Sequence, residues 1–300
     1  MTAFVKEIEK QIIEKFEYPK QAVRLIPFFF GEKEIELITQ IEKDCFDSRD
    51  YPTEVLTDWY QRGILSYKDK EKGIFQLGTF YTMLDVFVVS KQELYATLSK
   101  EDRNMLDDWY FNAYYDGLKP GREVCPTDDR VLPLEETLEF IEQESRPIYL
   151  NECDCRSLLG DCKMPTQTCL TYKSGPNTLQ DRGLSKALTK EEAKEVVRKA
   201  DKAGLIHTVN ANGICNCCTD CCYLFRSQSK RDSVGIWPAT KTLVHLDSDK
   251  CIGCGRCIKR CGFQLFKKEE TKVTCHTSGC VGCGLCVNTC PTGALILTER

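Results

Sequence analysis

The sequence predicts an α+β protein with a mainly helical N-terminal domain (residues 1–120), a cysteine-rich central domain (121–242) and a C-terminal module (243–300). Three observations predict this arrangement. Apolar residues recur at helical spacing through much of the first region. The 300-residue chain contains 20 cysteines, and apart from Cys45 all of them lie beyond residue 120. The C-terminal region contains one cysteine pattern twice.

Three helices are expected first, because apolar side chains recur three or four residues apart over residues 3–16, 32–43 and 53–62. Two short strands, 64–67 and 74–78, then flank a charged turn, as in a β-hairpin. Three helices followed by a hairpin is the element order of a winged helix. We therefore predict a winged-helix-like unit in the N-terminal domain.

A winged helix often binds DNA, but the charge of this one argues against that role. The expected recognition helix, "TEVLTDWYQRG", contains Glu54 and Asp58, and the formal net charge of the chain is −4. A phosphate-binding face requires the opposite sign. No nucleic-acid partner is expected, and a structural or protein-docking role is favoured. A redox-sensing winged-helix regulator is kept as an alternative.

Further helices are predicted over residues 91–118, 134–144 and 189–203. The last has the clearest boundaries, because Thr189 and Glu192 form a capping-box pattern and Gly204 is a typical stop. A short strand at "LIHTV" is expected to follow. This strand carries the chain into the densest group of cysteines, "GICNCCTDCC".

The cysteine content suggests metal binding. The N-terminus lacks the apolar core of a secretory signal, and no apolar run reaches the roughly 18 residues of a membrane span. We expect a cytoplasmic protein without a membrane span. In a reducing cytosol, dense cysteines favour metal ligation over disulfides.

The strongest motif is the repeat "CIGCGRCIKRCGFQLF" (251–266) and "CVGCGLCVNTCPTGAL" (280–295), each with the spacing Cys-x2-Cys-x2-Cys-x3-Cys. Two-residue gaps let three thiolates bind three corners of an iron–sulfur cube, while the fourth cysteine binds the other cube. The glycines between them allow tight bends and bring amide groups near the sulfurs.

These residues resemble the bacterial two-cluster [4Fe-4S] ferredoxin module, which implies a ferredoxin-like (βαβ)2 fold. The resemblance implies two [4Fe-4S] clusters, with ligands Cys251, Cys254, Cys257 and Cys290 for the first and Cys280, Cys283, Cys286 and Cys261 for the second. Two features depart from the family pattern. Gly262 replaces the usual proline, which Pro291 retains in the second repeat, and Cys275 is an additional thiol. The module is mildly basic, so Lys259 and Arg260 are candidates for docking an acidic partner or domain.

The central region forms a candidate additional metal site. Its cysteines are Cys153, Cys155, Cys162, Cys169, Cys215, Cys217, Cys218, Cys221 and Cys222. Spacing argues against the usual chelate from Cys153-x-Cys155, and adjacent cysteines should diverge, so ligands are expected from separate loops. A further iron–sulfur cluster (or more than one), a structural zinc site and a reactive thiol site for a substrate or cofactor are all open. Arg156 could lower a thiol pKa, and His207 could be a ligand or proton donor.

The whole chain also resembles functionally unassigned (4Fe-4S)-binding proteins of anaerobic bacteria and archaea. The matching residues are Cys153, Cys155, Arg156, Gly204, Leu205, Ile206, His207, Asn210 and 214–218. The leading hypothesis is an electron-transfer protein that relays low-potential electrons through two [4Fe-4S] clusters to the central centre or to a redox partner protein. The alternative is a reductase or reductive activating enzyme with its substrate at the central cysteines. The roles of Cys125 and Cys275 are not predicted.

Overall fold

The computed structural model describes residues 3–41, 45–121, 124–238 and 240–300. The chain forms two compact units. The first comprises Met1–Ala113, Ser157–Leu159 and Ser174–Ser185, and the second comprises Tyr114–Arg156, Gly160–Lys173 and Lys186–Arg300. The sequence predicts three domains, whereas the central and C-terminal segments belong to one unit in the structure.

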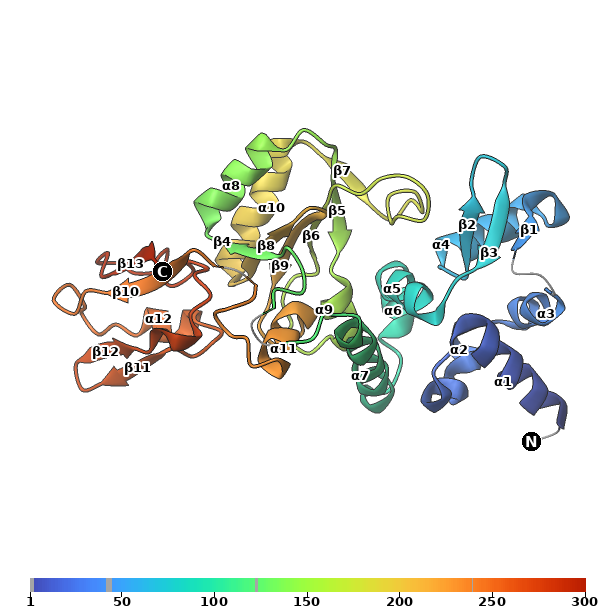
Figure 1. Cartoon of the computed structure of the whole chain (residues 1–300), viewed down its shortest axis with the longest axis horizontal. Coiled ribbons are helices and arrows are strands. Elements are labelled where there is room, and N and C mark those ends of the chain that lie inside the picture. The colour runs from blue at the N-terminus through green and yellow to red at the C-terminus, as the bar shows by residue number, and fades with distance from the viewer. Residues whose placement is uncertain (1–2, 42–44, 122–123, 239) are drawn as a thin grey trace. The chain divides into compact units, whose positions relative to one another are not determined.

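The N-terminal region is mainly helical, as predicted (Figure 1). Its α-helices are α1 (Ala3–Phe16), α2 (Ile26–Phe29), α3 (Glu32–Gln40), α4 (Thr53–Gln61), α5 (Phe80–Ser90), α6 (Gln92–Tyr95) and α7 (Lys100–Asp116), with 3-10 turns η1 (Lys20–Leu25) and η2 (Ser48–Asp50). The predicted helix 32–43 ends at Gln40, and residues 42–43 lie outside the described part. The predicted helix 91–118 is interrupted between α6 and α7, and α5 was not predicted.

A small antiparallel sheet accompanies these helices. Its strands are β1 (Cys45–Asp47), β2 (Leu65–Asp69) and β3 (Ile74–Leu77), in the order β1-β3-β2. The predicted hairpin corresponds to β2 and β3, while β1 is an additional strand on the other side of β3. Aromatic side chains from several helices form the core, with ring centroids 5.1 Å apart for Phe16 and Phe30 and 5.2 Å apart for Phe29 and Phe80.

The second unit is built on a six-stranded antiparallel sheet. Its strands are β4 (Arg130–Leu132), β5 (Ile148–Glu152), β6 (Gln167–Thr171), β7 (Lys186–Leu188), β8 (Ile206–Asn210) and β9 (Gly213–Cys217), in the order β4-β8-β9-β6-β5-β7. The connection from β6 to β7 contributes residues 174–185 to the first unit. There Asn177 accepts a 2.7 Å hydrogen bond from the Tyr67 amide and donates a 2.9 Å bond to the Tyr67 carbonyl.

Helices α8 (Leu134–Gln143) and α10 (Lys190–Ala203) cover one face of this sheet (Figure 1). Apolar side chains of both helices pack with those of β6, β8 and β9 to form one buried cluster. The predicted capping box is confirmed, since Thr189 and Glu192 bond each other reciprocally, and Gly204 ends α10 in the left-handed region. The opposite face carries α9 (Asp154–Leu159) and α11 (Tyr223–Lys230), each preceded by a cysteine as its N-cap residue.

The C-terminal segment contains two antiparallel strand pairs. β10 (Thr242–Leu246) pairs with β13 (Leu295–Glu299), and β11 (Phe266–Glu269) pairs with β12 (Lys272–Cys275). Helix α12 (Arg256–Arg260) lies in the first repeat. The second repeat has consecutive turns where the (βαβ)2 expectation has a helix, with amide bonds from Val287 and Asn288 to the Gly284 carbonyl. The 3-10 turn η3 (Thr277–Gly279) precedes this repeat.

Candidate metal centres

The four cysteines expected at the first cluster surround one cavity. Cys251, Cys254, Cys257 and Cys290 line it together with apolar side chains that include Leu246, Val273 and Leu295. Cys257 is buried and Cys254 is exposed. Cysteines from both ends of the C-terminal segment therefore converge on one site.

The four cysteines expected at the second cluster are also neighbours. Burial raises the pKa of the Cys283 thiol to about 12, and the negative charges of Cys280 and Cys261 add to this shift. Burial raises the pKa of Cys286 as well, with the same two neighbours and Cys283 contributing. These thiols hold their protons unless a cation replaces them. Iron is a cation of this kind.

Two glycines position main-chain amides on sulfur, as the sequence predicts. The Gly253 amide lies 3.4 Å from Cys251 Sγ, and the Gly282 amide lies 3.4 Å from Cys280 Sγ. Both glycines have positive φ, and a Cβ on Gly253 would lie 1.9 Å from the Thr271 carbonyl oxygen. A side chain at this position is therefore excluded.

The central cysteines separate into two groups. The larger is a chain of free thiols in which each sulfur lies within hydrogen-bonding reach of the next, in the order Cys155, Cys153, Cys169, Cys215, Cys217 and Cys222. The sequence argues against a chelate from Cys153 and Cys155. The structure brings their sulfurs together because Cys153, which directly follows β5, is the N-cap residue of α9, and Cys155 lies in the first turn of that helix.

Strand register explains how distant cysteines meet. Cys215 and Cys217 alternate with Asn216 on β9 and so project from one face of the sheet. Cys169 lies on the neighbouring strand β6, and Cys222 caps α11. This face is the one opposite α8 and α10, so the sheet has an apolar core on one side and thiols on the other.

Charge is distributed unevenly along the thiol chain. Hydrogen bonds from Cys155 and Cys169 lower the pKa of Cys153 despite its burial, and the Arg156 guanidinium contributes. Bonds from Cys169 and Cys217 lower the pKa of Cys215 in the same way. The role anticipated for Arg156, lowering a thiol pKa, thus has a structural basis.

Arg156 is buried and fixed among these cysteines. One guanidinium nitrogen donates to the Asn216 carbonyl over 2.7 Å, and another donates to Thr168 Oγ1. Burial opposes its charge, while the negative sulfurs, beginning with Cys153 and Cys169, raise its pKa. It therefore provides a permanent positive charge beside the thiols.

His207 lies on the other face of the sheet. It pairs in register with Asn216, and its Nδ1 is 2.6 Å from Asn216 Oδ1. Its Nε2 is 3.8 Å from Asp201 Oδ1 of α10. These contacts give His207 a structural role, and they do not direct it toward the sulfurs as a ligand.

The smaller group contains Cys162, Cys218 and Cys221, and Asp220 joins it. A hydrogen bond from Cys221 lowers the pKa of Cys218 to about 7. Adjacent cysteines diverge as predicted, because Cys217 and Cys222 join the larger group while Cys218 and Cys221 join the smaller one. Asp220 was missed by sequence reasoning, although its position inside Cys218-x-x-Cys221 could have indicated it.

The larger thiol group packs against the C-terminal segment. Cys217 and Cys222 belong to a buried apolar cluster that includes Val281 and Leu285, with Cys283 packed against it. Arg260 donates to the Lys202 carbonyl over 2.8 Å and to the Asp201 carbonyl at the end of α10. Arg260, a candidate for docking an acidic partner or domain, makes these contacts within its own unit.

Other cysteines and polar groups lie nearby. Cys275 is partly buried within the C-terminal core, and burial raises its pKa to about 11. Cys125 is exposed and lines a cavity of about 480 Å³ with Asp129 and Asn210. Burial raises the pKa of Asp129, and Cys215 adds to the shift. The cavity is thus electrostatically linked to the larger thiol group.

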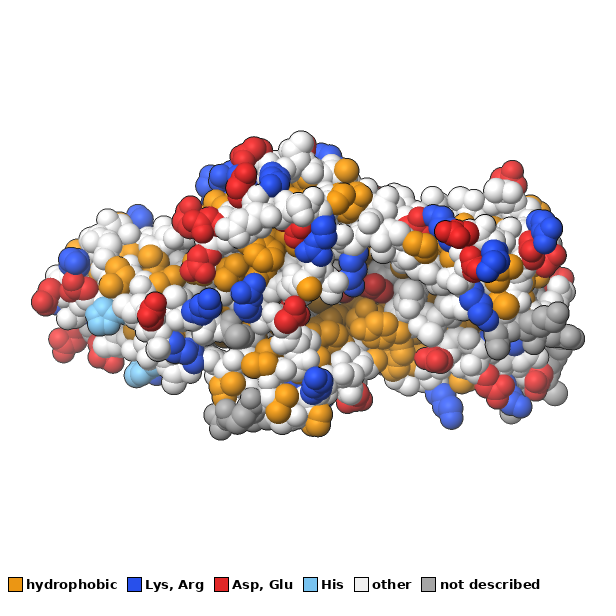
Figure 2. All heavy atoms as spheres, turned by 45° about the horizontal axis from the view of Figure 1, so that its top comes forward, with side chains coloured by type: hydrophobic (Ala, Val, Ile, Leu, Met, Phe, Trp, Pro, Cys, Tyr) orange, Lys and Arg blue, Asp and Glu red, His pale blue; other side chains and the backbone are white. Residues whose placement is uncertain are grey.

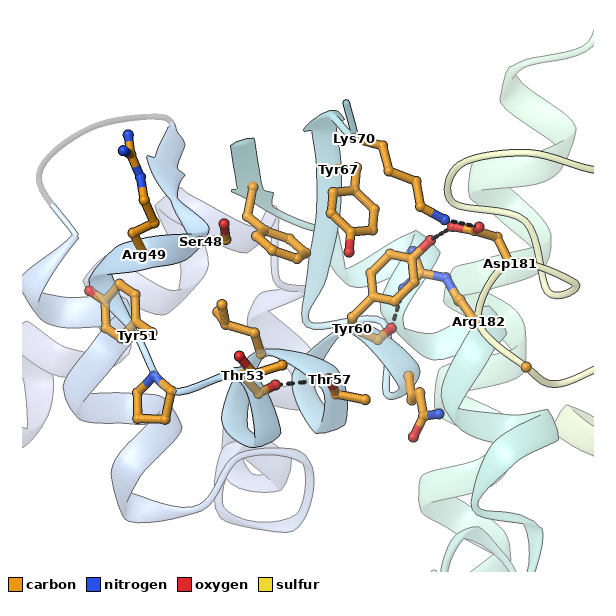
Figure 3. Close-up of a pocket in the computed structure, with 15 residues that line it drawn as sticks. Ser48, Arg49, Tyr51, Thr53, Thr57, Tyr60, Tyr67, Lys70, Asp181 and Arg182 are labelled. Carbon is orange, nitrogen blue, oxygen red and sulfur yellow. Dashed lines mark hydrogen bonds and ion pairs between the residues drawn. The ribbon is translucent and has the colours of Figure 1, made fainter. Parts of the chain in front are cut away.

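The first unit has a separate pocket of about 740 Å³ between α4, the β2–β3 hairpin and the 174–185 segment (Figure 3). Tyr60 donates a hydrogen bond to Asp181, which also pairs with Lys70. The buried Arg182 donates to the main chain of Tyr60 and Leu65. These hydrogen bonds and the ion pair join the 174–185 segment to α4 and the hairpin.

Comparison with known families supports the C-terminal assignment. Residues 244–297 match the family model for a 4Fe-4S dicluster domain, so the C-terminal segment is a ferredoxin-type iron–sulfur module. No curated protein and no solved structure matches the chain. Among the described residues, none of the helices is both long and apolar enough to cross a bilayer. On the face shown in Figure 2, basic and acidic side chains are interspersed.

Proposed function

We propose that this protein is an intramolecular electron relay, in which a two-cluster [4Fe-4S] module exchanges electrons with an iron–sulfur centre at the larger central thiol group. The dicluster domain and the many cysteines favour iron–sulfur electron transfer. The observation that carries the proposal is the packing of Cys283 against the cluster that contains Cys217 and Cys222. A partner protein would supply or accept the electrons.

The ligand sets follow from the resemblance and agree with the observed grouping. Cys251, Cys254, Cys257 and Cys290 would hold the first cluster, and Cys261, Cys280, Cys283 and Cys286 the second. Bound clusters supply reversible one-electron chemistry. The protein contributes burial and the amide bonds of Gly253 and Gly282, which stabilise negative sulfur.

The larger central group fits an iron–sulfur centre by its donor set. It offers six thiols, more than one cube requires, they extend as a chain across the neighbouring strands β6 and β9 instead of lying in one compact group, and Arg156 balances part of their charge. Val281, Leu285 and Cys283 pack with Cys217 and Cys222 of this group in one buried apolar cluster, so apolar side chains join it to the second cluster site. A short, apolar path of this kind suits electron exchange without proton uptake.

The test is electron paramagnetic resonance of the anaerobically prepared, fully reduced protein. If the centres are neighbours, their spins interact and the wild-type spectrum is broadened or split. Removing the central centre with Cys217→Ala and Cys222→Ala should leave the simpler spectrum of the dicluster module, with lower iron and sulfide. Cys45→Ser, which alters a cysteine of the first unit, is the matched control. A wild-type spectrum equal to the sum of independent centres, or unchanged iron in the double variant, would contradict the relay.

A reductase or reductive activating enzyme is the second candidate function, and the cavity at Cys125 and Asp129 favours it. A substrate there would lie beside the larger thiol group, to which Asp129 is electrostatically coupled. An electron paramagnetic resonance spectrum of the central centre that changes when a small substrate is added would favour the enzyme function. A spectrum insensitive to small molecules would favour the relay.

The N-terminal region is proposed to be a winged-helix-like docking unit for the redox partner. The exposed side chains of α4 include Glu54 and Asp58, and Arg62 at its end pairs with Glu34 and Asp58. This surface would repel phosphates, which weighs against the regulator alternative. DNA binding that weakens with salt would restore that alternative.

A further inference from the structure

The smaller central group has the composition and size of a single-metal site. Cys162, Cys218, Cys221 and Asp220 each offer one ligand atom, and these atoms all lie within 4.8 Å of one another. Around a tetrahedral zinc ion with Zn–S bonds of about 2.3 Å, sulfurs are separated by about 3.8 Å. A [4Fe-4S] cube must fit between its sulfur ligands and holds them further apart. The compact group therefore suits one ion better than a cube.

The local chain geometry is that of a metal-binding turn. Cys218 and Cys221 have the two-residue spacing common in zinc sites. The Cys221 amide donates to Cys218 Sγ over 3.3 Å, which curls the turn around the sulfur. Cys218 and Cys221 are buried, whereas Asp220 is exposed. The turn directs two sulfurs inward and offers a carboxylate from the solvent side.

Cys162 brings a ligand from a different part of the chain. It lies in the connection between α9 and β6, whereas the turn lies between β9 and α11. A shared ion would therefore crosslink two loops that the strands alone do not join. Between Cys218 and Asp220, Thr219 lies against Gly262, which directly follows the cluster ligand Cys261 in sequence. A rigid turn at this place would hold the central region on the dicluster domain.

We propose that Cys162, Cys218, Asp220 and Cys221 bind one zinc ion, separate from the iron–sulfur centres, which clamps this turn against the dicluster domain. Zinc has no redox chemistry, so the site stabilises the relay contact without accepting electrons. Three thiolates and one carboxylate, all ligands that zinc accepts, would supply the four-coordinate shell of a structural site. The role of the ion as a clamp rests on the proposed relay. Zinc binding itself does not, because the four ligands alone define the site.

The experiment uses the full chain, produced in zinc-supplemented medium and purified anaerobically, with zinc, iron and sulfide measured per chain. The wild type should contain about one zinc in addition to its iron. Cys162→Ser should lose the zinc and keep iron and sulfide unchanged, with a lower melting temperature. Cys45→Ser should match the wild type in all four quantities. Because Asp220 is the exposed ligand, Asp220→Asn should weaken zinc retention against a chelator rather than abolish binding.

Cobalt(II) provides a readout that does not depend on stability. Cobalt in the wild type should give the intense visible bands of a tetrahedral thiolate site, and Cys162→Ser, which is expected to lose the bound ion, should lose these bands as well. Zinc absent from the wild type, or iron and sulfide lost in Cys162→Ser, would overturn the proposal. The spin interaction of the iron centres is measured separately, so failure of the zinc site and failure of the relay are distinguishable.

Discussion

Thr219 lies against Gly262 so closely that a Cβ on the glycine would be 2.6 Å from Thr219 Cγ2 and 2.7 Å from Oγ1. This contact explains why glycine stands where the two-cluster ferredoxin pattern has proline. The turn that carries Cys218 and Cys221 occupies the space that a larger residue would need.

Gly262→Ala is expected to destabilise the protein by about 1–3 kcal/mol, the usual effect of overpacking. Thr219→Ala removes both clashing atoms, so the double variant should recover most of the lost stability. Melting temperatures of the wild type, the two single variants and the double variant measure this coupling. Additive losses would show that the two residues do not oppose each other.

Gly253→Ala is expected to impair the first cluster site. The added Cβ would meet the Thr271 carbonyl oxygen at 1.9 Å, and φ at this residue is +67°. Gly293→Ala is the matched control, because Gly293 also has positive φ (+63°) but nothing within 4 Å of its would-be Cβ. The control should lose only the roughly 1–2 kcal/mol of a left-handed residue. Iron content and melting temperature should fall much further for Gly253→Ala, and equal losses would contradict the close approach.

Arg260→Ala is expected to loosen the attachment of the dicluster domain to α10. The variant loses the bonds to the Lys202 and Asp201 carbonyls, which satisfy the end of that helix. A loss of about 1–3 kcal/mol is expected for hydrogen bonds to a charged group. The neighbouring Lys259 is exposed, so Lys259→Ala should leave the melting temperature unchanged. If Lys259→Ala and Arg260→Ala lowered the melting temperature equally, the loss of positive charge would explain the effect, and the hydrogen bonds of Arg260 would not.

Arg156→Gln should lower the reduction potential of the proposed central centre. Loss of a buried positive charge beside Cys153 and Cys169 disfavours the more negative, reduced state. Arg156→Lys, which keeps the charge but not both bonds to Asn216 and Thr168, should shift the potential less. Anaerobic redox titration measures the shift. A potential unaffected by Arg156→Gln would place the centre elsewhere.

Asp129 should make folding depend on pH. Its pKa is raised in the folded protein, chiefly by burial, so the stability associated with its protonated form is present at low pH and lost as pH rises through the folded value. Asp129→Asn removes this pH-dependent loss of stability, because asparagine does not titrate. The difference in melting temperature, variant minus wild type, should therefore be more favourable to the variant at mildly alkaline than at mildly acidic pH. A difference independent of pH would mean that Asp129 does not titrate in this range.

The sequence by itself determined the local features of this protein. The repeat at 251–266 and 280–295 indicates the dicluster domain by short spacings, and the boundaries of α10 follow from Thr189, Glu192 and Gly204. These features depend on residues that are close in the sequence, so they can be predicted from the sequence alone. The same holds for the divergence of adjacent cysteines in an extended strand.

Only the tertiary structure decided how the central cysteines group and what they contact. The pairing of β6 with β9 brings Cys169 beside Cys215, and the loop carrying Cys162 meets the turn at Cys218. His207, attractive as a ligand by its nearness in sequence, is directed to the opposite face by the alternation of β8. Which thiols share a centre depends on strand register and loop packing between distant segments, and no local spacing encodes that.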